Sequence, residues 1–278
     1  MKLQYLGTGG AEGFPGMFCG CRACRRARAE KQYKARSCSL LNDSILIDLS
    51  PDLYMQSLRF DVDLTAVRAL VVTHSHRDHL DPFGVCLRAR DGASQRPDLS
   101  EEENRLPVYG GERVLETIRA ELDNQPHANR ARLELHAIRA GSPFRVKDVE
   151  FHPIEANHKP DEQCFIFAVR EGQSWLLYAN DTGELPQKSL EAIRRLGAVF
   201  DVVSMDCARG ILPGDGHMGL GENIALRDFL RQSGCVKETT RYYLNHFSHM
   251  CGLLPDEMEA IAGEQSFTLA RDGMILTV

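Results

Sequence analysis

The amino-acid sequence predicts an α/β protein in which strands are buried between layers of helices. Two observations predict this class. Short apolar runs that end in turn residues alternate with longer stretches in which apolar residues recur every three or four positions. Strand-like runs are present in both halves of the chain with helical stretches between them, which is typical of sheets covered by helices.

Each element follows from its length and pattern. Apolar runs of about four to seven residues that stop at a turn residue are the length of strands. The expected strands are residues 3–6, 44–49, 69–73, 106–109, 149–154, 164–169, 174–178, 199–205 and 241–244, with 267–270 and 274–278 as a closing pair. The expected helices are residues 52–60, 81–90, 111–122, 186–196, 221–233 and 254–263. The charged stretch 88–105 is expected to be a solvated loop.

The composition is that of a folded globular protein, with 43% hydrophobic and 26% charged residues in a chain of 278. Because the chain has no low-complexity tract and no Pro/Gly/Ser-rich linker, we expect one domain over residues 1–278. Acidic residues outnumber basic ones by 39 to 33, which gives a net charge of −6 and disfavours an extended nucleic acid as the partner. A local basic rim could still bind a single phosphate group.

The sequence also indicates where the protein works. No apolar run approaches the roughly 20 residues that cross a bilayer, so no membrane partner is expected. The first residues lack the apolar stretch and cleavage site of a secretory signal, so we expect a cytoplasmic protein. In that reducing compartment, nine cysteines indicate metal binding or burial rather than a disulfide framework.

A cluster of metal-binding residue types directly follows the expected strand 69–73. His74 and His76 are two residues apart, so in an extended segment their imidazoles point the same way. Asp78 and His79 follow at the turn into the next helix, where they can face the other side. Four such side chains within six positions suit one or two divalent cations, and zinc, manganese and iron all accept these ligands.

A second cluster places Cys19, Cys21 and Cys24 within six residues, a density that indicates structural zinc in a reducing compartment. Structural zinc usually has four ligands, so one is missing. His249 is our candidate and Cys251 is its rival. Either would attach the loop of residues 17–36 to the C-terminal part of the chain; the alternative is that the cysteines are reduced and unligated.

The segment His74-Ser75-His76-Arg77-Asp78-His79 matches the His-x-His-x-Asp-His signature and resembles the metallo-β-lactamase-fold hydrolases. The resemblance implies an αββα sandwich of two mixed sheets with a dinuclear metal site at one edge. It also implies three further ligands, each placed at the end of an expected strand: His158, Asp181 and His246. One cation would be held by His74, His76 and His158, and the other by Asp78, His79 and His246. Asp181 and a hydroxide would bridge the two cations.

A narrower resemblance rests on the loop Gly7-Thr8-Gly9-Gly10-Ala11-Glu12-Gly13, the Cys-x-Cys-x-x-Cys cluster and the segment 246–249. Together they resemble the phosphodiesterases of the phosphonate carbon–phosphorus lyase pathway (PhnP-like). In that branch three cysteines and the late histidine hold a structural zinc, and the dinuclear site cleaves phosphodiesters and cyclic phosphates. Residues 91–145 match least. The PqqB-type proteins share the glycine loop and the cysteine cluster but typically lack the intact histidine signature.

The resemblance therefore implies a dinuclear-metal phosphodiesterase with two zinc or manganese ions and one structural zinc. Its partner would be a small phosphorylated substrate such as a ribosyl cyclic phosphate or a 2′,3′-cyclic nucleotide, and a homodimer is possible. We expect direct catalytic roles for Asp78 and for His217, the candidate general acid, which otherwise is a solvated loop histidine. Asp48 and Asp206 either orient metal-binding histidines or cap strand ends. The alternatives are a thioester or RNA-processing hydrolase of the same fold, or a PqqB-like carrier.

Overall fold

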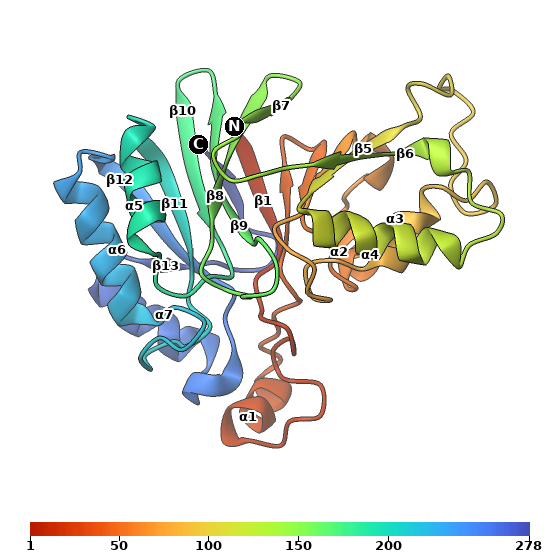
Figure 1. Cartoon of the computed structure of the whole chain (residues 1–278). Helices are drawn as coiled ribbons and strands as arrows, with labels where there is room; N and C mark the ends of the chain where they lie inside the picture. Colours follow the sequence, from red (N-terminus) through yellow and green to blue (C-terminus); the bar gives the residue numbers. More distant parts are fainter.

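The computed structural model describes residues 1–278 and has two seven-stranded sheets packed face to face (Figure 1). The first sheet has the order β14 (Ile275–Thr277), β1 (Lys2–Gly7), β2 (Cys38–Leu41), β3 (Ile45–Ile47), β4 (Ala69–Val71), β5 (Leu106–Gly110), β6 (Leu133–Ala137). The second has the order β13 (Thr268–Leu269), β12 (Val236–Asn245), β11 (Phe200–Asp206), β10 (Ser174–Ala179), β9 (Phe165–Glu171), β8 (Val149–Glu155), β7 (Phe144–Val146). Both sheets mix parallel and antiparallel pairs.

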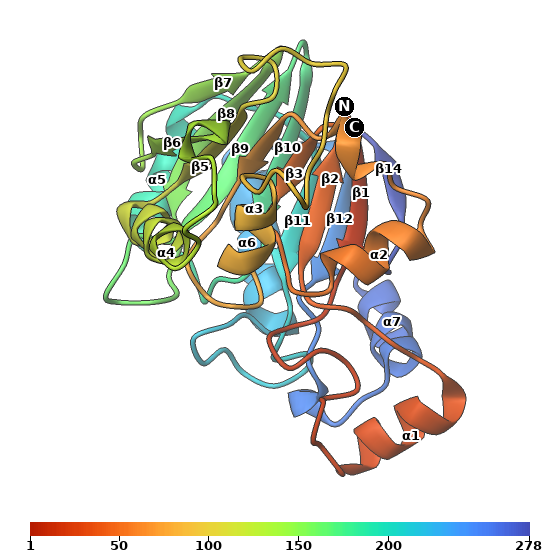
Figure 2. The same cartoon turned by 90° about the vertical axis from the view of Figure 1, so that its right-hand side faces the viewer.

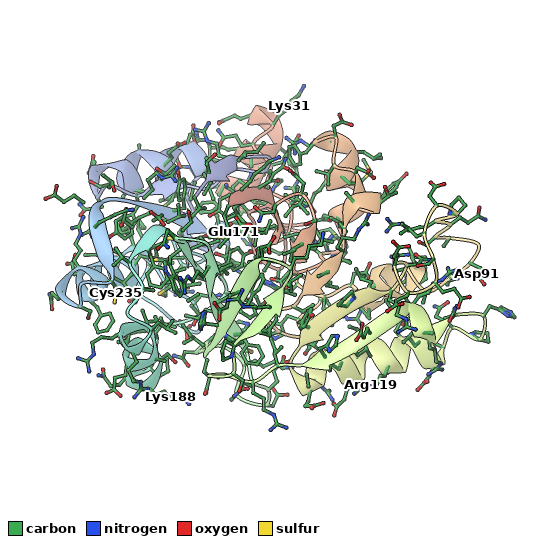
Figure 3. All side chains as sticks on the ribbon, turned by 90° about the horizontal axis from the view of Figure 1, so that it is seen from above. Lys31, Asp91, Arg119, Glu171, Lys188 and Cys235 are labelled. Atoms are coloured by element: carbon green, nitrogen blue, oxygen red, sulfur yellow. The ribbon has the colours of Figure 1, made fainter.

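Helices cover the outer face of each sheet. The first sheet carries α2 (Leu53–Arg59), α3 (Pro82–Leu87) and α4 (Glu112–Asp123), and the second carries α5 (Gln187–Arg195), α6 (Leu220–Gln232) and α7 (Pro255–Glu264). Seen from above, Arg119 on α4 and Lys188 on α5 lie on opposite flanks (Figure 3). The short 3₁₀ helices are η1 (Leu64–Ala66), η2 (Arg130–Arg132) and η3 (His249–Cys251). None of the helices combines the length and apolarity that crossing a bilayer requires. The αββα sandwich implied by the resemblance is confirmed.

Apolar residues on alternating sides of the strands build this layered core. In β3, Ile45 and Ile47 are buried between the sheets, whereas Leu46 packs under the helices of the outer layer. In the neighbouring parallel strand β4, Val71 faces the inner core and Leu70 the outer one. A strand covered on both faces needs apolar residues at every position, which explains why these short runs are continuous rather than alternating.

Four parallel strands in each sheet bring the candidate site residues to one edge. Strands β3 to β6 run parallel in the first sheet, and β10 to β13 run parallel in the second. The histidine signature follows β4, while Asp181 and His246 follow β10 and β12. Ligands of α/β sheets bind outside the carboxyl ends of parallel strands. Helix α1 (Arg22–Glu30) projects from the lower end of the sandwich (Figures 1 and 2).

The structure corrects the expected elements at several points. Residues 267–270 and 274–278 do not pair with each other: β13 extends the second sheet beside β12, and β14 covers the edge of β1 in the first sheet. Strands β2, β6 and β7 were not expected. β6 and β7 have exposed residues and weak apolar runs, so long-range pairing rather than local pattern makes them strands. Much of the poorly matched stretch 91–145 forms β5, α4 and β6, which complete the first sheet.

The last residue of β1 provides a test of this packing. A Cβ atom on Gly7 would lie 2.0 Å from the Arg36 carbonyl oxygen and 2.3 Å from Gln56 Nε2. Because the nearest neighbour is backbone, Gly7→Ala is expected to lower the free energy of unfolding by about 2 kcal/mol or more in urea titrations. Gly263→Ala in α7 is the control: nothing lies within 4 Å of its added Cβ, so stability should stay the same or rise by up to about 1 kcal/mol. Equal effects of the two substitutions would contradict the close approach at Gly7.

Candidate metal centres

The histidine signature forms a compact turn directly after β4. The His76 carbonyl accepts hydrogen bonds from His79 N (3.0 Å) and Leu80 N (2.8 Å), which turns the chain back toward the sheet. His74 and His79 are consequently buried, while His76 is half-buried at the outer side. The turn therefore presents two pairs of ligand types in different directions, as their spacing predicts.

Seven side chains from four segments, the turn itself included, converge here. One group consists of His74, His76, His158 and Asp181, and the other of Asp78, His79, Asp181 and His246. Within each group, one ligand atom per residue lies within 4.8 Å of all the others. Asp181 belongs to both, with its Oδ2 3.1 Å from His74 Nε2 and 3.1 Å from His79 Nε2. The structure thus brings together all seven residues predicted for the dinuclear site, with the predicted bridging residue in the middle.

Left-handed backbone at two strand ends aims the late ligands. Asp181 has a φ of 54° and His246 a φ of 58°, a region that residues other than glycine seldom adopt. Asp48, directly after β3 in the first sheet, has a φ of 64°. Such conformations cost free energy and concentrate at functional sites. Here they turn each side chain off the end of its strand and toward the shared centre.

The donor set fits divalent cations. His158 Nε2 lies 2.9 Å from His76 Nδ1, and His79 Nε2 lies 3.2 Å from His246 Nε2. Buried ligand atoms among these side chains form no hydrogen bond: His74 Nε2, Asp78 Oδ2, Asp181 Oδ1 and His246 Nδ1. Buried polar atoms are normally satisfied, so this number of unsatisfied atoms at one point indicates groups that a cation would join.

Electrostatics keep the carboxylates in the form that binds cations. Burial would raise the pKa of Asp181, but the charge of His246 and the close contacts with His217, His74 and His79 hold that pKa well below its usual range. The pKa of Asp78 is likewise lowered, because the charges of His79 and His246 outweigh its burial. Burial lowers the pKa of His158 to about 4, so its ring is neutral near pH 7. Ionised carboxylates and neutral imidazoles are the forms that metals bind.

Asp48 orients the histidines from behind, which is one of the two roles expected for it. Its Oδ2 accepts a hydrogen bond from His79 Nδ1 at 2.7 Å, so Nε2 of that ring faces the centre. Its Oδ1 also accepts from Thr73 N at 2.8 Å, which is the expected capping role. The Thr73 hydroxyl donates to Asp48 and accepts from His74 Nδ1 at 3.0 Å. Sequence reasoning missed Thr73, although its place between strand and signature was a signal.

His217 lies beside the dinuclear group, and Asp206 holds it there. The His217 ring centroid is 5.1 Å from that of His158, and its side chain is 23% exposed. Its Nδ1 lies 3.0 Å from Asp206 Oδ2 and 3.0 Å from Asp181 Oδ1. Burial lowers the pKa of His217, but these two carboxylates outweigh it and raise the pKa to about 10. Asp206 is fully buried and also lies 3.6 Å from His246 Nδ1, so it contacts both histidines.

The three clustered cysteines meet His249 below the sandwich. His249 Nδ1 lies 3.7 Å from both Cys19 Sγ and Cys21 Sγ, and Cys24 completes the group. The Cys21 sulfur accepts a hydrogen bond from Cys24 N, the N-terminal capping arrangement of α1. Cys251, the rival fourth ligand, instead donates its thiol to the Ser248 carbonyl at 3.7 Å. Three thiols and one imidazole at these distances fit tetrahedral zinc.

Local contacts favour the thiolate form of one of the three cysteines, Cys21. Burial alone would raise the pKa of Cys21, but hydrogen bonds from Cys24 N and neighbouring side chains lower it to about 6. Cys24 keeps a pKa raised to about 12 by burial. On the far side of the ring, His249 Nε2 lies 3.4 Å from Glu12 Oε1. Sequence reasoning did not single out Glu12, although it lies within the glycine loop.

Comparison with known proteins decides the family. The β-lactamase superfamily domain matches residues 43–247, which contain the signature and the three later ligands. The chain belongs to the β-lactamase superfamily. Coenzyme PQQ synthesis protein B of Pseudomonas aeruginosa is 29% identical over 224 residues, 70% of each chain. Octanoyltransferase of Porphyromonas gingivalis is 29% identical over 210 residues, 72% of this chain, which covers only 38% of the length of that protein.

Solved structures share the fold over nearly the whole chain. A diphosphatase from the PhnP family superposes with a TM-score of 0.74 at 22% identity, covering 100% of this chain and 97% of that one. Zinc-bound PqqB from Methylobacterium extorquens gives 0.67 at 14% identity, covering 100% of both chains. Human tRNase Z, short form, gives 0.64 at 16% identity, covering 100% of this chain and 99% of that one. The resemblance to metallo-β-lactamase-fold proteins, including the PhnP family, is thereby confirmed at the level of the fold.

The hydrogen bond between Asp48 and His79 yields a test of the dinuclear group. In Asp48→Asn, the amide cannot accept from both Thr73 N and His79 Nδ1 with the strength of a carboxylate. We expect the affinity of the centre for zinc to fall roughly 10- to 100-fold in chelator competition. Asp43→Asn, at an exposed partner of Lys2, should bind zinc like the unaltered chain. Unchanged affinity in Asp48→Asn would refute the orienting role.

The cysteine cluster is tested by its metal content. Cys21→Ser is expected to lose about one zinc per chain in elemental analysis, because a hydroxyl is a poor zinc ligand where a thiolate is needed. Cys251→Ser should keep that zinc, since its thiol contacts a carbonyl outside the cluster. Loss of zinc from Cys251→Ser alone would assign the fourth ligand to the rival cysteine.

Proposed function

We propose that the protein is a metal-dependent phosphodiesterase that hydrolyses small phosphodiesters or cyclic phosphates. The observation that carries the proposal is the complete set of seven histidine and aspartate side chains around Asp181. The likeness in fold to a diphosphatase of the PhnP family supports a phosphate compound as the substrate. Superfamily membership supports metal-dependent hydrolysis as the reaction class.

The residues divide the chemistry between two positions. His74, His76 and His158 would hold one cation, Asp78, His79 and His246 the other, and Asp181 both. When bound, a pair of zinc or manganese ions supplies a water of lowered pKa and positive charge for the reacting phosphate oxygens. The protein holds the ligands in a buried, fixed arrangement. In such a site, positive charge stabilises the transition state more strongly than it would in water.

In this proposal His217 is the general acid that gives the leaving oxygen its proton. Its Nδ1 is anchored by the Asp206 carboxylate, so the imidazole is held at a fixed angle and Nε2 is the nitrogen left for substrate. The loop that carries it is itself held, because Asp206 Oδ1 accepts hydrogen bonds from Ala208 N at 2.9 Å and Met218 N at 3.2 Å. Asp206 therefore acts on the reaction through the ring it positions.

Charge near the cysteine cluster supports a small substrate rather than a polyanion. Seven arginine and lysine residues lie between Arg22 and Arg36, beside the cluster, and most of them make contacts within the protein. Arg26 pairs with Glu257, Arg36 with Asp52, and the Arg28 guanidinium donates to the Gly16 and Cys19 carbonyls. The whole chain has a net charge of −6, so few arginine and lysine side chains are left to contact the phosphates of a nucleic-acid backbone.

Two further parts of the proposal follow from the cysteines and the relatives. Three thiols that bind zinc must stay reduced, which supports a cytoplasmic location. A PqqB-like carrier is the second candidate function, because coenzyme PQQ synthesis protein B is 29% identical over 70% of this chain. The intact set of seven ligands favours the hydrolase.

A substrate panel tests the reaction class. The purified protein is assayed with bis(p-nitrophenyl) phosphate, a 2′,3′-cyclic nucleotide, a thioester and a β-lactam, each with added Mn²⁺ or Zn²⁺. We expect metal-dependent turnover of the phosphodiesters. Turnover of only the thioester or the lactam would overturn the phosphodiesterase assignment, and no turnover with a metal-loaded centre would favour the carrier.

The general acid is tested by leaving-group dependence. His217→Ala is expected to slow a diester with a poor alkoxide leaving group by about 10²- to 10⁴-fold, because that leaving group needs a proton. A p-nitrophenolate leaving group needs none, so its release should slow much less. His136→Ala, at a ring stacked on Tyr109 far along the chain from the centre, is the control and should change neither rate. Equal losses on both diesters would argue against proton donation by His217.

A further inference from the structure

Glu162 is a buried carboxylate outside the set of predicted ligands. It lies in the loop between β8 and β9, and its side chain is only 3% exposed. Its Oε1 accepts a hydrogen bond from Ser75 Oγ at 2.8 Å, and its Oε2 accepts one from Ser75 N at 3.2 Å. Lys159 Nζ lies 3.2 Å from Oε1. One side chain thus joins two loops that are more than 80 residues apart in the sequence.

The two partners of Glu162 are the immediate neighbours of metal-ligand candidates. Ser75 stands between His74 and His76, and Lys159 directly follows His158. These three histidines are the ones assigned to a single cation position. No contact links the Glu162 carboxylate to the other position, whose ligands are Asp78, His79 and His246.

Burying this carboxylate costs free energy, which indicates that it does more than cap the backbone of one loop. Moving an ionised group out of water costs free energy unless opposite charges and hydrogen bonds replace its hydration. A neutral amide could accept from Ser75 alone without that cost. Only a carboxylate accepts from the hydroxyl and the amide of Ser75 and pairs with Lys159 at the same time. The arrangement therefore resists any change in the spacing between the two loops.

We propose that Glu162 is a positioning residue that sets the distance between the His74–His76 loop and His158, so that one of the two cation positions depends on it. The distance that Glu162 would set is the one between two candidate ligands, since His158 Nε2 lies 2.9 Å from His76 Nδ1. Because it rests on the proposed dinuclear centre, the inference predicts an asymmetric defect. Loss of Glu162 weakens one position and leaves the other.

Zinc binding to the metal-free protein tests the asymmetry. Glu162→Ala is expected to bind one of the two zinc ions of the centre at unaltered affinity and the other about tenfold more weakly or worse in chelator competition. Glu162→Gln keeps an acceptor for Ser75 but loses the charge opposite Lys159, so its loss should be smaller. If Glu162→Ala does not fold, the same measurement is made on Glu162→Gln. Asp161→Asn is the matched control, because Asp161 lies 3.6 Å from the same Lys159 Nζ but is 66% exposed and does not contact Ser75.

Hydrogen exchange gives a second measurement that needs neither metal nor activity. In the metal-free protein, the Ser75 amide should exchange at least several-fold faster in Glu162→Ala than in Asp161→Asn. Unchanged exchange together with equal affinity at both zinc positions would overturn the inference. If Glu162→Ala shows the asymmetric loss of zinc affinity but the unaltered protein, with both zinc ions bound, hydrolyses no phosphodiester, the proposed substrate is wrong and the inference stands. A protein that binds zinc only at the cysteine cluster would overturn both.

Discussion

The convergence on Asp181 is the constraint on which the rest of the structure depends. This one carboxylate contacts histidines from three different loops, those of His74 and His79, of His158 and of His217, and it is almost wholly out of water. Such a concentration of carboxylates and imidazoles is unfavourable in a low-dielectric interior unless opposite charges share the space. The chain accepts left-handed backbone at Asp181 and His246 to build it. Both costs make sense for a site that holds cations.

The packing of the two sheets keeps that convergence in register. A buried polar chain crosses the inner core, where Tyr5 donates from its hydroxyl to Ser204 at 2.8 Å and Ser204 donates to the Asn180 side chain at 3.0 Å. Asn180 immediately precedes Asp181. A hydrogen-bonded chain inside an apolar core specifies one alignment, because sliding the sheets would leave its members unpaired. The alignment of the two sheets therefore also fixes the position of Asp181.

The cysteine cluster and the dinuclear group share one short segment. His246 belongs to the central group and His249 to the cysteine cluster, while Phe247 between them pairs with the glycine loop through Gly10 N and Thr8 O. Glu12 reaches from that loop to His249. A zinc ion in the cluster would hold the far end of the segment that presents His246. With that zinc bound, the segment around α1 would anchor one edge of the site.

The spacing of residues along the chain indicated two candidate metal groups. The resemblance that this spacing supported implied the sandwich, which is confirmed, and named the later candidate ligands. The signature from His74 to His79 and the three clustered cysteines could be interpreted locally, because neighbouring residues in a strand or loop have predictable directions. Only the tertiary structure decided that His249 rather than Cys251 meets the cysteines, that the last two strands go to different sheets, and that Glu162 joins two loops. Those outcomes depend on how two sheets pack, and no local pattern encodes contacts between distant segments.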